Sequence, residues 1–231
     1  MSNDESFYFA IPRQPSGKPI TQEEAERLLL EKLKKTGNEY LEALWSLAYF
    51  YSKTGQQKES RQYLDRLIAN TDDPEKRAGA YLALGQLMEQ MGNFEDAIVF
   101  YSQAFSLEPE NTATWYLINN NLGYCLNITN RHAEAESYCR HAIQIDPSRQ
   151  NAYKNLGISL AGQGDYPQAA RNYIKATRAN AADSRALDLL EQLYFEHPEM
   201  KIEIPDIEEE IQKCRQAVMA VLEYRQKKSQ E

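Results

Sequence analysis

Apolar residues recur at helical spacing along most of this chain, with short polar breaks between the runs. Between residues 78 and 111 two such runs are separated by Gly92. Apolar side chains three and four positions apart share one face of a helix, and a glycine just after such a run ends it. This stretch therefore predicts two helices joined by a tight turn. Its pattern positions are Tyr81, Leu84, Gly85, Met88, Gly92, Phe94, Ala97, Tyr101, Ala104 and Pro109.

The same order of positions occurs in four consecutive units, which are residues 41–74, 78–111, 116–149 and 150–183. The first unit follows it loosely, because Ser60, Leu64 and Leu67 replace the usual Ala, aromatic residue and Ala. Gly123 and Gly157 are one interval of about 34 residues apart, whereas Gly85 and Gly123 lie slightly further apart. We place the extra residues at the start of the first helix in the second and third units. Good helix beginnings stand there, namely Asp73–Pro74 and Asn111–Thr112.

Small residues at fixed places predict how the two helices of a unit pack. Antiparallel helices approach closely only where a side chain is nearly absent. We expect the small residues of the first helices, Ala48, Gly85, Gly123 and Gly157, to face those of the second helices, Ala97, Ala135 and Ala169. The turn after the first helix needs a left-handed residue. Such residues stand there in every unit, namely Gly55, Gly92, Asn130 and Gly164.

The segments before the first unit have a different pattern. Prolines in residues 1–20 block a regular helix, so we expect a flexible arm there, with an apolar cluster at residues 7–11. That cluster either packs on the first helices or lies in a binding groove of its own or a neighbouring chain. Residues 21–40 predict an N-terminal capping helix, because Thr21 and Glu24 form a capping box and the apolar spacing continues to Gly37.

Residues 184–231 predict two further helices. The first, around 184–196, keeps the apolar spacing of a first helix but has Glu191 where the small residue should be. The second is long and has one apolar stripe, formed by Ile207, Ile211, Cys214, Val218, Val221 and Leu222. It either covers the end of the stack or forms a dimer seam.

The order of bulky, small and turn positions resembles the tetratricopeptide repeat. The resemblance implies an all-α, right-handed solenoid of antiparallel helix pairs, with about four repeats between capping helices. It also implies a concave groove lined by the first helices, which binds a peptide or helix of another protein. The implied groove residues are Trp45, Tyr49, Ser52, Leu82, Gln86, Glu89, Asn120, Asn121, Tyr124, Asn127, Asn151, Lys154, Asn155 and Ile158.

Two known uses of such grooves can be compared with these residues. The two-carboxylate clamp for chaperone tails needs Lys and Asn where this chain has Trp45 and Tyr49, or Leu82 and Gln86, so the clamp is absent. Asn121 and Asn155 resemble the asparagine ladder in the repeats of O-linked N-acetylglucosamine transferase. A row of amides can pair with an extended backbone; the alternative is that both are solvated polar residues.

Composition narrows the class of partner. The net charge of -8 disfavours nucleic acid. No apolar run is long enough for a signal peptide or a membrane span, which predicts a cytoplasmic protein without a membrane partner. Three cysteines lack metal-ligand spacing and are expected to be free thiols packed in the core, namely Cys125, Cys139 and Cys214.

No phosphate loop, nucleophile motif or metal-ligand pattern occurs in the sequence. We therefore predict no catalytic residue, no cofactor and no metal. The function expected from the sequence is a non-catalytic interaction module, such as an adaptor, scaffold or co-chaperone. The alternative is a self-associating scaffold, a homodimer for example, joined by the N-terminal arm or the last helix. An enzyme with an unrecognised site is a remote third reading.

Overall fold

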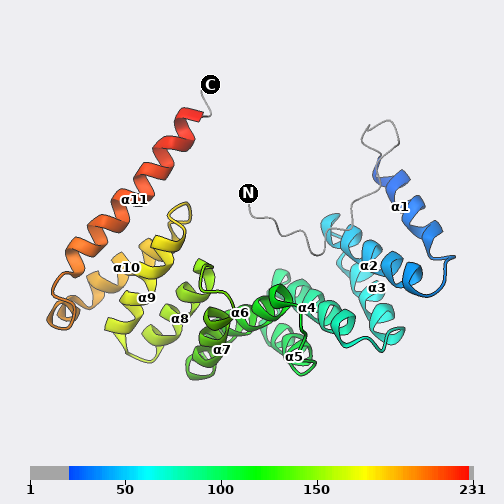
Figure 1. Cartoon of the computed structure of the whole chain (residues 1–231), viewed down its shortest axis with the longest axis horizontal. Coiled ribbons are helices and arrows are strands. Elements are labelled where there is room, and N and C mark those ends of the chain that lie inside the picture. Colours follow the sequence, from blue (N-terminus) through cyan, green and yellow to red (C-terminus); the bar gives the residue numbers. More distant parts are fainter. Residues whose placement is uncertain (1–20, 229–231) are drawn as a thin grey trace.

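The computed structural model describes residues 21–228, which form a curved stack of helices without any strand (Figure 1). The N-terminal arm and its apolar cluster at residues 7–11 lie outside the described residues. The helices are α1 (Gln22–Lys32), α2 (Asn38–Lys53), α3 (Gln57–Ala69), α4 (Pro74–Gln90), α5 (Phe94–Phe105), α6 (Thr112–Ile128), α7 (His132–Ile145), α8 (Gln150–Gly162), α9 (Tyr166–Ala179), α10 (Arg185–Glu196), the 3-10 helix η1 (Pro198–Ile202) and α11 (Ile207–Lys228).

Consecutive helices form antiparallel pairs, and each pair packs on the next. The pairs are α2 with α3, α4 with α5, α6 with α7 and α8 with α9. The first helix α6 also contacts the first helices α4 and α8. The pairs follow an arch, and its two ends, α1 and α11, rise on the same side (Figure 1). The predicted solenoid of helix pairs is confirmed.

Local capping sets the longer first helices of the second and third pairs. The Asp73 carboxylate accepts a hydrogen bond from the Glu75 backbone N–H at 2.9 Å, and the Asn111 side chain accepts one from Thr114 N–H at 3.0 Å. Helices α4 and α6 each have 17 residues, whereas α8 has 13. The extra residues therefore stand where the sequence places them, at the starts of α4 and α6.

The glycines of the first helices face larger side chains than we predicted. A Cβ atom on Gly85 would clash with the ring of Tyr101, and one on Gly157 would clash with Tyr173. At Gly123 the clashing atom would be Cys139 Sγ. These three residues stand four positions after the alanines we expected at the contact, so they lie on the same helix face one turn further on. Each glycine makes room for a ring or a sulfur atom.

The structure confirms the predicted left-handed turn at Asn130 and corrects the predicted end of the first helix. Asn130 has φ of 59°, in the same left-handed region as Gly92 at 77°, as predicted. Helix α1 begins with Thr21 accepting from the Glu24 N–H at 3.2 Å, but it ends at Lys32 and does not continue to Gly37. Gly37, with φ of 61°, instead precedes α2, where the chain reverses direction.

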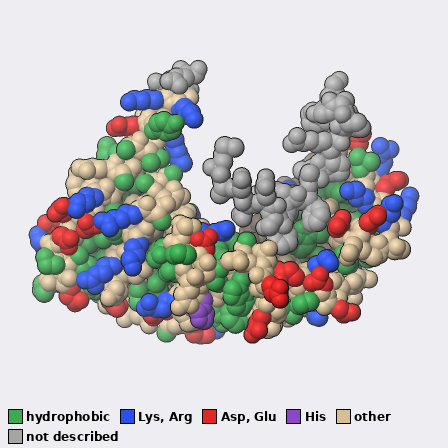
Figure 2. Space-filling model, in the orientation of Figure 1, with side chains coloured by type: hydrophobic (Ala, Val, Ile, Leu, Met, Phe, Trp, Pro, Cys, Tyr) green, Lys and Arg blue, Asp and Glu red, His purple; other side chains and the backbone are tan. Residues whose placement is uncertain are grey.

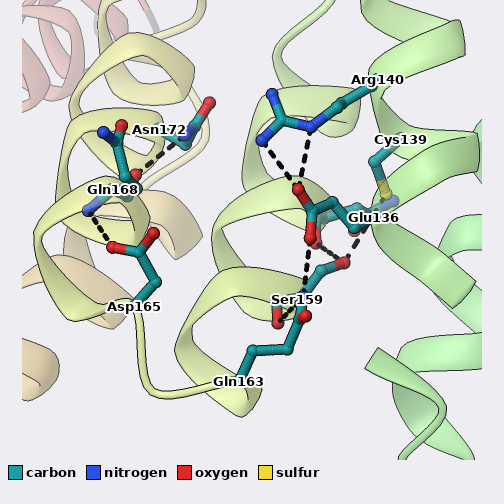
Figure 3. Close-up of polar contacts among 9 residues, drawn as sticks. Glu136, Cys139, Arg140, Ser159, Gln163, Asp165, Gln168 and Asn172 are labelled. Atoms are coloured by element: carbon teal, nitrogen blue, oxygen red, sulfur yellow. Dashed lines mark hydrogen bonds and ion pairs between the residues drawn. The ribbon is translucent and has the colours of Figure 1, made fainter. Parts of the chain in front are cut away.

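Polar side chains as well as apolar ones join the third and fourth pairs (Figure 3). The Glu136 carboxylate on α7 accepts hydrogen bonds from Arg140 on the same helix at 2.7 Å and from Gln163, just after α8, at 2.8 Å. These contacts hold the pKa of Glu136 below its usual value. Beside them, Ser159 and Cys139 meet in the buried interface, and Ser159 has no exposed surface. The two pairs are thereby joined by matched polar groups.

The last helix covers the end of the stack with only part of its length. Ile207, Ile211, Cys214 and Val218 are buried against α9 and α10. Beyond Val218 the helix extends away from the body (Figure 1), and Leu222 is 48% exposed. The apolar stripe predicted as far as Leu222 is therefore fully buried only as far as Val218, while Val221 is half-buried and Arg225 still donates a hydrogen bond to the Ala182 carbonyl at 3.4 Å.

Candidate binding groove

The first helices α2, α4 and α6 enclose a hollow of about 300 Å³. Five predicted groove residues line it, namely Trp45, Tyr49, Ser52, Leu82 and Gln86. Leu117 on α6 also lines it, although we did not predict that contact. The extra residues at the start of α6 place Ala113, Thr114 and Leu117 against α4, and this could have been read from the longer interval before Gly123.

Aromatic side chains form one wall of the hollow. The indole of Trp45 lies beside Gly79, where an added Cβ would be 3.6 Å from the ring. The ammonium of Lys53 lies 5.3 Å from the centre of the Tyr49 ring, within the range of a cation–π contact. The predicted contact Ser52 stands on the same wall. A large apolar side chain entering here would meet aromatic and aliphatic surface, and the polar side chains of Gln86, Gln90 and Thr114 also line the hollow.

Farther along α4, a carboxylate stands beside the groove. Glu89 accepts a hydrogen bond from the Tyr101 hydroxyl at 2.8 Å, and that hydroxyl accepts one from the Asn121 amide at 3.3 Å. Burial raises the pKa of Glu89, while the bond from Tyr101 lowers it. Burial and the nearby Glu89 charge also raise the pKa of Tyr124, a half-buried predicted groove residue on α6. This part of the groove is polar and weakly acidic.

The asparagines predicted for the groove join α6 to α8. Asn155 is 2% exposed, and its amide donates to the Asn120 side chain at 3.1 Å. The Asn127 amide donates to the Asn155 carbonyl at 2.8 Å, and its oxygen accepts from the Ser159 hydroxyl at 3.0 Å and contacts His132 Nδ1 at 3.1 Å. Asn127 and Asn120 are also buried. A partner reaching Asn155 would have to break its bond to Asn120, whereas Asn121 is half-buried.

Two cations stand near the C-terminal end of the groove. Lys154 on α8 is half-buried, and it makes no hydrogen bond or ion pair with any described residue. Burial and the charge of Arg185 lower the pKa of Lys154, and Asp183 opposes this. Arg185, at the start of α10, binds the Asp183 carboxylate, with its Nε at 2.8 Å, and holds the pKa of Asp183 at about 2. This region can attract an anionic group.

The remaining predicted residues lie on α8. Asn151 is half-buried, and its side-chain oxygen has no hydrogen-bond partner among the described residues. Ile158 is half-buried and packs against the core formed by α8 to α11. Ile158 therefore contributes to packing more than to an open surface.

Charge is unevenly distributed on the face seen in Figure 2. Acidic side chains gather near α4 and α5, and Lys and Arg are frequent toward the C-terminal helices. Among the described residues, no group of three or more His, Cys, Asp or Glu side chains is placed to hold a metal ion. No helix within residues 21–228 is long and apolar enough to cross a membrane. The three cysteines are buried and free, and burial raises the pKa of Cys125 to about 12.

These helix pairs and their concave hollow define a helical-repeat protein of the α-solenoid class. Sequence profiles of the tetratricopeptide repeat match residues 42–70, 78–111, 116–149 and 154–201. These matches run through all four predicted units and extend over α10. The chain belongs to the tetratricopeptide repeat family.

Curated relatives share parts of the repeat region. A TPR repeat-containing thioredoxin of Arabidopsis thaliana is 30% identical over 109 residues, covering 47% of this chain and 15% of the relative. A peroxisomal targeting signal receptor of Eremothecium gossypii is 29% identical over 114 residues, covering 49% and 19%. Heat shock protein STI1 of Saccharomyces cerevisiae is 25% identical over 117 residues, covering 51% and 19%. The chain thus spans less than a fifth of each of these relatives.

Solved structures share the fold. MamA from Desulfovibrio magneticus superimposes with a TM-score of 0.64 at 14% identity, covering 80% of this chain and 98% of that one. YrrB, described as a TPR protein with an unusual peptide-binding site, gives a TM-score of 0.59 at 19% identity, covering 86% and 98%. At these identities the similarity establishes the architecture alone.

Proposed function

We propose that this protein is a non-catalytic adaptor that holds a peptide or helix of another protein in the concave groove. The hollow between α2, α4 and α6 carries the proposal, because Trp45, Tyr49 and Leu117 offer apolar surface around about 300 Å³. Repeat proteins generally bind partners on extended concave surfaces. The relatives include a peroxisomal targeting signal receptor and a heat shock protein, which supports an adaptor or co-chaperone role. A cytoplasmic location stays a prediction from the sequence.

The experiment is selection of random twelve-residue peptides on the full-length chain. Ala83 is half-buried on α4 and lines the hollow, so Ala83→Phe places a ring in it. Val99→Phe is the matched control, since Val99 is 55% exposed on the second helix α5 and does not line the hollow. We expect the selected peptides to bind Ala83→Phe at least about tenfold more weakly, and Val99→Phe unchanged. Equal binding to both variants, or no enrichment of any peptide, would contradict the proposal.

The second candidate is a self-associating scaffold. The half of α11 beyond Val218 carries exposed apolar side chains, namely Met219 at 54%, Leu222 at 48% and Tyr224 at 62%. Met219 and Leu222 are three positions apart and share one face of α11, whereas Tyr224 lies on another side. An exposed apolar face such as that of Met219 and Leu222 is typical of a helix that pairs with another helix. Light scattering of the full-length chain and of Leu222→Glu tests this reading. A monomer in both cases would eliminate it.

A further inference from the structure

The described chain begins beside the helix that forms one wall of the hollow. Tyr51, near the end of α2, donates a hydrogen bond to Glu26 of α1 at 2.5 Å, and Ala25 packs in the same small core as Tyr51. Tyr49 and Lys53 stand on this half of α2 and line the hollow. Residues 12–20, extended, span roughly 30 Å, and neighbouring packed helices are roughly 8–10 Å apart. The chain before residue 12 can therefore reach the hollow.

The segment at that distance along the chain is rich in aromatic side chains, which can pack on the apolar lining of the hollow. Residues 7–11 read Phe-Tyr-Phe-Ala-Ile, the only run of adjacent aromatic residues within the first twenty. Aromatic side chains gain most from leaving water, and each buries roughly 150–250 Å². The hollow is lined in part by Trp45, Tyr49, Leu82 and Leu117. Apolar surface on both partners favours their contact.

The start of α1 and the cations along the groove both indicate in which direction the segment would run. Because the described chain begins at Thr21, the N-cap of α1, a segment that enters the hollow from there would continue from α4 toward α6 and α8 with the residues preceding Phe7. Asp4 and Glu5 precede the aromatic cluster, and Asp4 reaches roughly 10 Å beyond Phe7 when extended. At that end of the groove Lys154 lacks an ion-pair partner among the described residues. Arg185 also stands there, although Asp183 neutralises part of its charge.

We propose that residues 4–11 of this chain lie in its own concave groove, with the aromatic cluster in the hollow and the acidic pair beside Lys154 and Arg185. The proposal rests on the proposed function, since it assigns a ligand to the same groove. It makes the arm an internal competitor: a partner segment binds only by displacing residues 4–11. The groove then favours partners that carry an acidic group followed by an aromatic one.

The experiment uses the indole of Trp45 as a reporter in the full-length chain. Trp115→Phe removes the other tryptophan of the sequence. The ring centroids of Trp115 and Phe105 are 4.8 Å apart in a stacked arrangement, and a phenylalanine ring at position 115 preserves that contact. Acrylamide quenching is compared between this protein and the same protein with Phe7→Ser and Phe9→Ser. We expect the quenching constant of Trp45 to be at least twofold higher in the serine variant. Circular dichroism checks that the helical body is unchanged.

A peptide of residues 1–12 is then added to the serine variant. We expect it to restore the lower quenching constant, and a peptide with Asp4→Asn and Glu5→Gln to bind roughly threefold more weakly, as expected of a partly exposed ion pair. In a serine variant that also carries Lys154→Gln, we expect the difference in affinity between the two peptides to become smaller, since only Arg185 is left near the acidic pair. This last comparison identifies the cation that the acidic pair contacts.

Specific outcomes would overturn the proposal. Equal quenching of Trp45 with and without the aromatic arm residues would show that the arm leaves the hollow open. Protection that appears only as the protein concentration rises would assign the segment to a second copy. The peptide selection with Ala83→Phe is repeated on the chain with Phe7→Ser and Phe9→Ser, in which the arm no longer competes, so failure of this inference is distinguishable from failure of the proposed function.

Discussion

The contact between Gly85 and Tyr101 offers a sharp test of how the repeat packs. Gly85→Ala places a methyl group where the Tyr101 ring lies, and that ring is fully buried. The ring cannot move outward freely, because its hydroxyl donates to Glu89 at 2.8 Å. Forcing an extra methyl group into a packed core costs about 1–3 kcal/mol. Breaking the hydroxyl bond adds about 1 kcal/mol.

The same substitution has an opposing effect on the helix itself. Alanine stabilises a helix interior by about 0.8–1 kcal/mol relative to glycine. The expected net effect of Gly85→Ala is therefore a loss of about 2 kcal/mol in the free energy of unfolding. Gly79→Ala is the matched control on the same helix. Its added Cβ would lie 3.6 Å from Trp45, an ordinary contact, so the helix gain remains and we expect stabilisation of about 0.5–1 kcal/mol.

Urea unfolding followed by circular dichroism measures both changes. Fits should use a repeat-by-repeat treatment if the transition is not two-state, as expected for solenoids. The reasoning requires opposite signs at the two glycines. If Gly85→Ala were as stable as the natural chain, the ring would be free to move and the close approach would not limit the fold. If both variants were destabilised equally, helix propensity would not be the opposing effect.

Further predictions concern polar groups in and beside the groove. Burial raises the pKa of Glu89, so the ionised carboxylate destabilises the folded state. Glu89→Gln should therefore become more stable relative to the natural chain as pH rises above about 4.5. Chemical unfolding of both proteins at pH 4 and pH 7 measures the difference. Asp183→Asn should lower the free energy of unfolding by no more than about 1 kcal/mol at pH 7. Acidification toward the Asp183 pKa of about 2 protonates the carboxylate of the natural chain and weakens its bond to Arg185, so the difference between the two proteins should vanish there. Asn127→Ala should destabilise by about 2–3 kcal/mol, since three polar partners lose their bonds, whereas Asn151→Ala should change stability by less than about 0.5 kcal/mol; thermal unfolding distinguishes the two.

Features determined by neighbouring residues in the sequence could be predicted. The starts of α4 and α6 follow from the capping side chains of Asp73 and Asn111. The left-handed turn at Asn130 follows from the need to reverse the chain after α6. These are local requirements, so the repeat pattern contains them. The order of helices and the pairing within each unit then follow from the spacing of the apolar faces.

Features determined by contacts between helices were harder to predict. The sequence does not reveal that Tyr101, one turn beyond Ala97, occupies the space at Gly85. Asn121 and Asn155 hold equivalent places in their units, yet only Asn155 is buried, because α8 packs directly against α6 at that point. Whether a polar residue faces the groove or the neighbouring helix depends on the position of the next unit. A pattern within one unit cannot specify this.

Buried residues that define the repeat and residues that line the groove differ in what they reveal about a partner. Residues that make a repeat recognisable, such as Gly85 and Tyr101, are buried, and the demands of packing fix them in any chain of this fold. They therefore say nothing about what the groove holds. The groove differs from one end to the other, with Trp45 and Tyr49 at the hollow and Lys154 toward α10. A segment that fills the whole groove gains from both ends in only one orientation, so this asymmetry can select the direction of a bound chain as well as its composition.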